Sequence, residues 1–591
     1  MAQAVKKKEK TKVKIKKPEI KQDNAPASLF KAKEEDKTDD QAASPFGVWS
    51  DLMEYQIDAF QRSVLFFDTL RQRADNMLEH EKAGMPPLLD FKYETVLDAR
   101  KFERPANYAL LKITEAGEDC LEDCLDPDKP PVMIVDPRAG HGPGIGGFKR
   151  DSEVGIALHE GHPVYFVIFY PDPEPDQTMG DVLAALRKFV EEVSAWHDNK
   201  PPVLYGNCQA GWMLALLSAD CSGLVGPAVM NGSPLSYWAG GEEMNPMQVR
   251  GGLSGGVWLT RMMSDMSNGI FDGAWLVHNF EQLNPAKAIW DKYYNLFANV
   301  DKESERFLSF ERWWNGFYSL SEEEITATVE NLFIGNKIER GEMVLDEHCA
   351  IDLKDIKNPL LIFASEGDEI TPPRQALHWI RAVYPDTKAL KKAGQRIVYL
   401  INPHVGHLGI FVSAKVAKLE HRAILENTAD IESLKPGLYE MIIDNPTGDP
   451  DCSRDQYEVR FEERLVEDIC ESVPQDSFEA VRSVSEKNDE RYKQFARPFV
   501  EAFANPLTAE VLKTAHPMRA SRKIFSEQLN PAMLPLPLAA QTVRDNRKAA
   551  AEDNPFKEME RQTAERIEAT IETMSDYHKK WQNAVFKAIY G

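Results

Sequence analysis

The chain has 591 residues, 43% of them hydrophobic and 28% charged, so it can build a large core and more than one domain. No apolar run approaches the roughly 18 residues that a membrane span needs, and no apolar segment follows the basic N-terminus as it would in a secretory signal. The formal net charge of −24 disfavours nucleic acid as the main partner.

The cysteines indicate a reducing environment. There are seven in this long chain, without a dense spacing pattern, which favours a cytoplasmic location. Cys120 and Cys124 are four residues apart, but no second pair follows at zinc spacing. We therefore expect ordinary thiols, no metal site and no cofactor.

The N-terminal 44 residues have little to bury and are predicted to be disordered. Nine Lys and two Glu lie within residues 1–22, so this segment is either a solvated tail or a contact for an anionic surface. Residues 45–90 form the next segment, and apolar residues at three- and four-residue steps predict a helix over 45–80.

Residues 91–430 alternate apolar strands with helices, which predicts an α/β fold whose mostly parallel sheet is covered on both faces. The strand runs are "PPVMIVDP", "HPVYFVIFYPDP", "PPVLYG", "LVGPAVMNGSP", "NPLLIFASEGDEITPP" and "QRIVYLINPHVGH". The alternation stops at 237–340, an aromatic and helical stretch. This insertion is predicted either to cap the site or to be a structural subdomain without a gating role.

Residues 431–591 are predicted to be mainly helical, with one strand-like run, "YEVRFEERLVED". The last helix, 555–590, is long and charged, which favours packing or oligomerisation over catalysis.

The stretch "VLYGNCQAGW" (203–212) places a cysteine between an apolar strand and an apolar helix. Small residues surround Cys208 there. A strand, a sharp turn of small residues and a helix is the setting of a nucleophile elbow, usually occupied by Ser. Cys208 is therefore a candidate nucleophile, and a buried thiol in a tight turn is the alternative.

A cysteine nucleophile needs a base and a group that orients the base. In α/β-hydrolases the chain order is nucleophile, acid, His. The loop "SEGDEITPP" supplies Asp368, with Glu366 as competitor, and "NPHVGHLGIF" supplies His407, with His404 as competitor. We favour Cys208, Asp368 and His407 as the triad.

The loop "DPRAGHGPGIGGFK" (136–149) is the expected second part of an oxyanion hole, because its glycines allow close backbone approach. The candidate donors are the N–H groups of Gln209, Gly140, His141 and Gly142. The loop also matches G-x-G-x-x-G, but no acidic ribose-binding residue ends the following strand, so a dinucleotide site is disfavoured. Lys149 and Arg150 are candidates to meet a phosphate of an acyl-CoA.

These motifs resemble those of poly(3-hydroxyalkanoate) synthases. "GNCQAG" is similar to their G-x-C-x-G-G box, with Ala210 in place of the first paired Gly, and "SEGDEITP" and "GHLGIF" resemble their acid and His loops. The resemblance covers roughly 90–430. It extends into the insertion, where an aromatic-rich stretch stands in the place of their lid. The Gly-rich loop 136–149 and the C-terminal region depart from the synthase pattern.

The resemblance implies an α/β-hydrolase-fold acyltransferase. Cys208 would attack a (3-hydroxy)acyl-CoA thioester, with His407 as base and Asp368 as acid. Trp212, Trp313, Trp314 and Lys149 are the expected substrate-binding residues. The alternatives are a thioesterase or polyester hydrolase at the same site, and a non-catalytic scaffold that binds a granule or partner. A polyester granule surface and a homo-oligomer are the possible larger partners.

Overall fold

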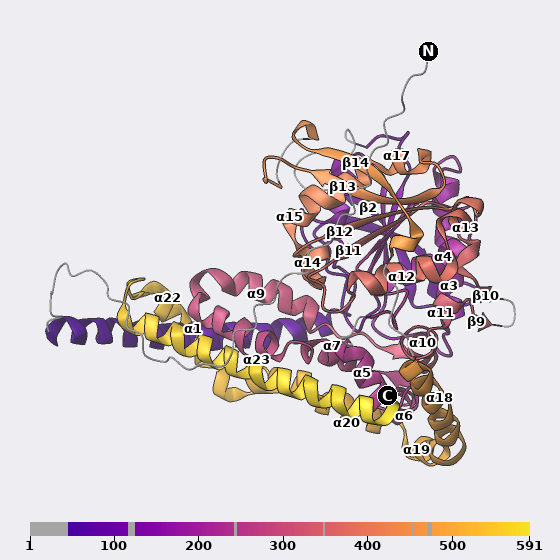
Figure 1. Cartoon of the computed structure of the whole chain (residues 1–591). Helices are drawn as coiled ribbons and strands as arrows, with labels where there is room; N and C mark the ends of the chain where they lie inside the picture. The colour runs from indigo at the N-terminus through magenta and orange to yellow at the C-terminus, as the bar shows by residue number, and fades with distance from the viewer. Residues whose placement is uncertain (1–44, 116–124, 241–244, 347–348, 451–453, 470–475) are drawn as a thin grey trace.

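The computed structural model describes residues 45–591 except 116–124, 241–244, 347–348, 451–453 and 470–475. It contains a sheet-based body and a long helical arm that projects from one side of it (Figure 1). The 44 N-terminal residues expected to be disordered, and Cys120 and Cys124, lie outside the described residues. Among the described helices, none is long and apolar enough to cross a membrane.

The body is built on one ten-stranded sheet, in the order β1-β2-β4-β3-β5-β6-β11-β12-β13-β14. The seven strands from β4 to β13 in that order pair in parallel, whereas β1, β2 and β14 pair antiparallel. The strands are β1 Lys92–Asp98, β2 Tyr108–Glu115, β3 Val132–Val135, β4 Val164–Phe169, β5 Val203–Asn207, β6 Ala228–Asn231, β11 Leu360–Ser365, β12 Arg396–Asn402, β13 Gly437–Asp444 and β14 Glu458–Arg464. This mostly parallel sheet with helices on both faces confirms the predicted α/β-hydrolase-type fold.

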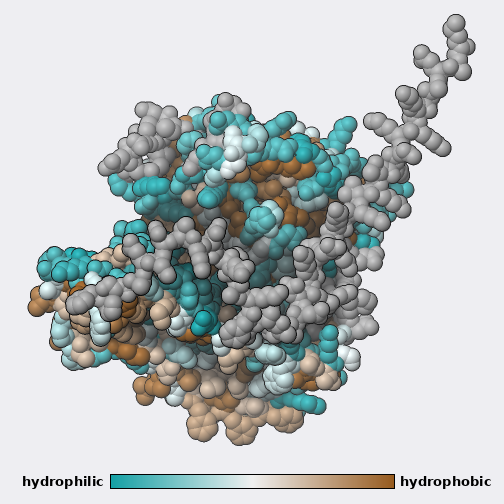
Figure 2. Space-filling view, turned by 60° about the vertical axis from the view of Figure 1, so that its left-hand side comes forward, coloured by the Kyte–Doolittle hydropathy of each residue, from teal (hydrophilic) through white to brown (hydrophobic). Residues whose placement is uncertain are grey.

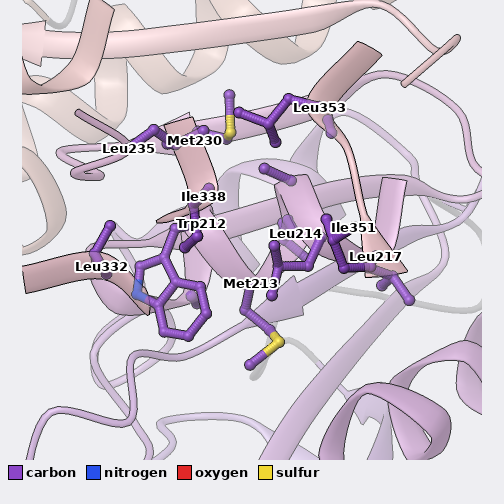
Figure 3. Close-up of a cluster of buried hydrophobic side chains, with 14 of the residues drawn as sticks. Trp212, Met213, Leu214, Leu217, Met230, Leu235, Leu332, Ile338, Ile351 and Leu353 are labelled. Atoms are coloured by element: carbon purple, nitrogen blue, oxygen red, sulfur yellow. The ribbon is translucent and has the colours of Figure 1, made fainter. Parts of the chain in front are cut away.

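The central strands are apolar throughout because each face of the sheet has its own core. Successive residues point to opposite faces: Leu204 belongs to one buried cluster and Tyr205 to the other. Figure 3 shows the first cluster, where Trp212, Met213 and Leu217 pack between the sheet and the helical insertion. The body helices are α2 Glu153–His159, α3 Met179–Trp196, α4 Gln209–Asp220, α12 Pro373–Val383, α13 Thr387–Lys392, α14 His407–Val412, α15 Ala414–Val416, α16 Arg422–Glu426 and α17 Thr428–Ser433.

The predicted insertion lies between β6 and β11. Two of its helices, α8 and α9, leave the body and pack along α1 (Pro45–Lys82) in the arm. Its elements are α5 Pro246–Leu253, α6 Trp258–Met266, β7 Ile270–Phe271, α7 Ala274–Glu281, α8 Lys292–Ala298, α9 Val300–Trp314, β8 Leu320–Ser321, α10 Glu322–Thr328 and α11 Lys337–Arg340, followed by the hairpin β9 Met343–Asp346 and β10 Cys349–Ile351. The insertion thus joins the arm to the body.

The arm combines the two ends of the described chain. The predicted helices at 45–80 and 555–590 are α1 and α23, and the remaining C-terminal helices are broken at prolines. Ion pairs tie the arm together, for example Arg62 of α1 with Glu560 of α23 at 2.8 Å. The C-terminal helices are α18 Asp476–Arg491, α19 Arg497–Phe503, α20 Pro506–Ala515, α21 Pro517–Phe525, α22 Leu536–Asp545 and α23 Pro555–Tyr590.

The sheet extends past residue 430, where the sequence placed the end of the α/β part. Strand β13 pairs in parallel with β12, and β14 pairs antiparallel with β13. The strand-like run around 458–464 is therefore an edge strand of the main sheet, and the helical region begins only after it.

Candidate active site

Cys208 occupies the turn between β5 and α4. Its backbone has φ of 50° and ψ of −115°, a conformation that non-glycine residues rarely adopt. Its N–H donates to the Asn231 carbonyl at 2.8 Å, which fixes the turn to the neighbouring strand β6. A strained residue held in this way between a strand and a helix is the geometry of a nucleophile elbow.

The small residues around Cys208 are required by packing. A Cβ atom on Gly211 would lie 1.8 Å from the Ser233 hydroxyl, and one on Gly206 would lie 2.7 Å from a methyl of Leu214. Ala210 is accommodated with its side chain buried. The departure from the synthase box at Ala210 therefore leaves the elbow intact.

The acid and His loops converge below the surface. Nδ1 of His407 lies 2.7 Å from Oδ2 of Asp368, and Oδ1 of Asp368 accepts hydrogen bonds from the N–H groups of Ile370 and Thr371 at 2.9 and 2.8 Å. The competitors Glu366 and His404 are both exposed. The structure thus brings together Asp368 and His407 and leaves the two alternatives in solvent.

Cys208 and His407 line the same cavity. Burial alone lowers the pKa of His407, but the charges of Asp368 and Cys208, with a hydrogen bond to each, raise that pKa well above its usual value.

A cavity of about 370 Å³ opens onto this pair, lined by Cys208 and His407. Its walls include Trp313 and Trp314, whose rings flank the His141 ring at centroid distances of 4.4 and 4.6 Å. The two tryptophans end helix α9, so the helix that reaches the arm also supplies the aromatic wall.

Trp212 lies elsewhere. It lines a second cavity of about 340 Å³, on the insertion side of the elbow, that does not include Cys208 or His407. The two cavities share Ala139 and Phe280. Trp212 is a buried helix residue facing this second space, so its direct contact with a substrate at Cys208 is not supported by the geometry.

The structure excludes one of the four candidate oxyanion donors. Gln209 begins α4, where the first N–H groups have no partner within the helix. The Gly142 N–H, however, donates to the Gly316 carbonyl at 2.9 Å, and the Gly140 carbonyl accepts from the Tyr318 N–H at 3.0 Å. The Gly142 N–H is therefore already bonded to the insertion. The N–H groups of Gly140 and His141 remain as candidate donors beside that of Gln209.

Lys149 does not line the cavity. Its ammonium donates to the Val412 carbonyl at the end of α14 and thereby ties the Gly-rich loop to the His407 helix. Arg150 pairs with Asp90 at 3.2 Å. The expectation that these two residues meet a substrate phosphate is therefore not supported. The sequence could not reveal the contact of Lys149, because Val412 lies 263 residues away along the chain.

Two buried carboxyl groups that the sequence did not single out lie under the loop and the elbow. Asp136 accepts the N–H groups of Gly144, Ile145 and Gly146, so these amides are occupied and unavailable to a dinucleotide pyrophosphate. Burial raises the pKa of Asp136 to about 7 despite these hydrogen bonds. The only sequence signal was its position at the end of an apolar strand.

Glu153 is the second group. Its Oε2 accepts from the Asn207 amide at 2.6 Å, next to Cys208 in the chain, and burial raises its pKa to about 8. Asn231 in turn donates to Asn207 at 2.9 Å. A polar network therefore supports the elbow from inside the sheet.

The C-terminal helix α21 contacts the part of the insertion that pairs with the Gly-rich loop. Arg522 donates to the Asn315 carbonyl, and the Arg519 and Arg522 guanidiniums lie 5.0 and 5.3 Å from the Phe317 ring centroid. Phe317 forms a β-bridge with His141. This contact chain links the C-terminal region to the candidate oxyanion donors.

Asp272 adds a second link. Arg519 holds its carboxylate, with one N–O distance of 2.9 Å, and the next residue, Gly273, packs so tightly on Gly140 that an added Cβ would lie 2.7 Å from the Gly140 Cα. The close contact between Gly273 and Gly140 thus leaves little room for the Gly-rich loop to move.

The sheet order, the elbow and the buried His–Asp pair define an enzyme of the α/β-hydrolase type. The chain belongs to the family described as "Protein of unknown function (DUF3141)", whose model matches residues 58–591. A relative from Rhizobium meliloti, "Uncharacterized protein in ackA 5'region", is 42% identical over 555 residues, which cover 92% of this chain and 75% of that protein.

Two more distant likenesses accompany the family match. The poly(3-hydroxyalkanoate) polymerase subunit PhaC of Haloferax mediterranei is 27% identical over 139 residues, which cover 23% of this chain and 26% of that protein. A solved thermophilic esterase from Thermogutta terrifontis covers 58% of this chain and 99% of its own, at 9% identity and a TM-score of 0.33.

Proposed function

We propose that the protein is a Cys-dependent acyltransferase that takes a (3-hydroxy)acyl group from a CoA thioester and passes it to a hydroxyl group. The observation that carries the proposal is the buried His407–Asp368 pair, which lies with Cys208 at the wall of one cavity. The local similarity to a polyhydroxyalkanoate polymerase subunit supports the same chemistry.

In the first half-reaction the Cys208 thiolate attacks the thioester carbonyl. Negative charge develops on the carbonyl oxygen, and the N–H of Gln209 with that of Gly140 or His141 stabilises it. The bond between the carbonyl carbon and the CoA sulfur breaks, and protonated His407 gives its proton to the departing thiolate. The products are free CoA and an acyl-Cys208 thioester.

In the second half-reaction His407, now neutral, accepts the proton of the acceptor hydroxyl. The acceptor oxygen attacks the acyl-Cys208 carbonyl, and the Cys208 thiolate leaves beside the imidazolium. Asp368 keeps the Nδ1 proton in place throughout and so presents Nε2 to the reacting groups. If the acceptor is a growing hydroxyacyl chain, the product is a polyester whose granule surface is a further partner.

The cavity walls favour transfer over hydrolysis. Phe310, Trp313, Trp314 and Phe411 surround the site with apolar surface, which limits access of water to an acyl-enzyme. Hydrolysis at the same site is the second candidate, since water can replace the hydroxyl as acceptor without any change in the triad.

The charged residues in the cavity lining suggest which part of the thioester carrier is recognised. Its lining contains Glu281, Asp291 and Glu369 against Lys287 and Lys292, and Lys292 already pairs with Glu311 at 3.0 Å. We therefore propose that recognition rests on the acyl and pantetheine parts more than on the CoA phosphates.

The test is incubation with (R)-3-hydroxybutyryl-CoA and with the matching acyl-pantetheine. Loss of thioester absorbance reports release, and chromatography distinguishes oligomer from free acid. The proposal predicts release from both carriers and a product longer than one unit. Free acid as the sole product would identify hydrolysis as the activity. If no thiol is released from a panel of acyl thioesters, both the acyltransferase and the hydrolase proposals are contradicted.

A further inference from the structure

Helix α1 carries a stripe of exposed apolar side chains along the first half of the arm. The stripe consists of Trp49, Met53, Ile57, Phe60 and Phe67, exposed by 65%, 52%, 40%, 68% and 46%, with half-buried Val64 between the last two. At about 100° per residue, all six positions fall within an arc of about 80° on the helix. They form one seam, which we call the α1 seam. Its C-terminal end already has partners in the chain, because Val64 packs against the cluster of Val300 and Val543, and the Phe67 ring stacks on Phe525 at a centroid distance of 6.4 Å.

The opposite face of α1 is fixed, so the α1 seam cannot rotate inward. Asp58 and Arg62 are buried and pair with each other at 2.8 Å, and Arg62 also pairs with Glu560 of α23. At the border of the seam, Asp68 pairs with Arg544 of α22 at 2.7 Å. These ion pairs hold the helix with its apolar seam outward.

The α1 seam is abnormal for a helix in water. Of the exposed residues between positions 48 and 67, only Glu54 is charged. A helix surface in water usually carries several charged side chains. In Figure 2 hydrophobic surface is visible both on the upper part of the molecule and along its lower part. A contiguous apolar surface of this kind marks an interaction site.

We propose that the α1 seam pairs with the α1 seam of a second copy of this chain, which makes the protein a twofold dimer joined through its arms. The seam residues follow one another at steps of four, four, three, four and three, the spacing by which one helix packs against another in a coiled coil.

The area of the seam is close to the minimum for a specific pair. From the size of aromatic side chains and the exposed fractions, the five exposed residues offer roughly 500 Å² per copy, or about 1,000 Å² for two copies. That total is at the roughly 1,000 Å² that a specific interface should clear, and neighbouring residues must add to it to reach the about 1,200–2,000 Å² of stable complexes.

The pattern fits a second copy better than a different partner. Charged side chains beside a coiled-coil seam set partner choice, and Glu54 is the one exposed charge along residues 48–67. An apolar stripe is self-complementary under a twofold axis. In an antiparallel pair, Ile57 and Phe60 lie nearest that axis.

The test is the mass of the full chain in solution, measured by light scattering after size exclusion at micromolar concentration. The proposal predicts a dimer of twice 66.9 kDa. Phe60→Glu places two carboxylates next to the axis and should weaken the dimer by at least about 100-fold, since each buried unpaired charge costs several kcal/mol. The far-ultraviolet spectrum should stay unchanged because Phe60 is exposed in the single chain.

Phe499→Glu is the matched control. Phe499 is 71% exposed on α19, outside the α1 seam, and its substitution should leave the dimer intact. A monomeric wild-type chain would overturn the proposal, as would a Phe60→Glu variant that remains dimeric. Dissociation by Phe499→Glu alone would place the interface on α19 instead. A wild-type monomer that floats with lipid vesicles would identify a lipid surface as the occupant.

Discussion

The Nδ1 atom of His407 lies 2.7 Å from Oδ2 of Asp368, and both side chains are buried at the edge of the sheet where β11 and β12 end. The two residues are 39 positions apart, and each follows its own strand. The fold alone brings them together, because adjacent parallel strands deliver their loops to the same edge.

This relationship predicts the reactivity of Cys208. Asp368 and Cys208 raise the pKa of His407 well above its usual value, and a cation beside a sulfur makes that sulfur more reactive toward alkylating reagents. Iodoacetamide should therefore modify Cys208 at pH 6.5 at least about tenfold faster than Cys221. Burial raises the pKa of Cys221 to about 12, which makes it the internal control. Equal, slow modification of both thiols would favour a non-catalytic scaffold.

Substitutions in the triad should separate its roles. Cys208→Ala should abolish thioester turnover with little effect on folding, and Cys208→Ser should retain little because Ser is harder to activate. His407→Gln should lower kcat by at least about 100-fold, and Asp368→Asn should lower it less. Near-normal turnover of His407→Gln would show that the base has been assigned wrongly.

The wall of the cavity should set acyl-chain length. Trp313→Ala enlarges the space beside Cys208 and should shift the kcat/KM ratio toward longer acyl chains by about tenfold. Trp212→Ala is the contrast, because Trp212 packs in the core away from the triad and should mainly lower stability, by about 3–5 kcal/mol. The measurements are kcat/KM for a series of acyl thioesters and urea unfolding. Equal preferences in Trp313→Ala and wild type would exclude this wall as the acyl site.

Buried Glu153 predicts how stability depends on pH. Its pKa of about 8 in the folded protein lies above its unfolded value of about 4.5, so the folded state binds the proton more tightly. The unfolding free energy should therefore fall as pH rises from about 4.5 to 8, by about 1–3 kcal/mol over the upper part of that range.

Glu153→Gln, which imitates the protonated form, should flatten this dependence and be more stable than wild type at pH 8. Asp136 titrates nearby with a pKa of about 7, so some slope should remain in the variant. Urea unfolding at pH 5.5 and pH 8 measures both effects. An identical slope in wild type and variant would show that Glu153 is ionised in the folded protein.

The contact of α21 with the insertion predicts that the C-terminal region affects turnover. Arg522→Met removes the hydrogen bond to the Asn315 carbonyl behind the oxyanion loop and should lower kcat by about 10-fold with little change in KM. Iodoacetamide modification of Cys208 should stay at the wild-type rate, because the His–Asp pair is untouched. A parallel loss of both would indicate general unfolding instead.

Local patterns predicted much of this molecule. Strand and helix periodicity gave the parallel sheet, and residues 45–80 and 555–590 correspond to the helices α1 and α23. The chain order of the motifs brought Asp368 and His407 together, because strand order constrains where their loops meet.

Features that depend on distant partners were not predictable. Lys149 contacts Val412, Gly142 is committed to Gly316, and Trp212 faces a second cavity, and no spacing in the sequence encodes these choices. Strands β13 and β14 were missed as sheet members because both are half-buried and lack a continuous apolar run.

Mass analysis of the chain after brief exposure to an acyl-CoA, followed by peptide mapping, reads out directly whether a sulfur carries the acyl group. We predict one added acyl group, on the peptide that contains Cys208, and none on the Cys208→Ala variant. Thioester turnover with no adduct at residue 208, or an unchanged rate in Cys208→Ala, would contradict the assignment of this cysteine as the nucleophile.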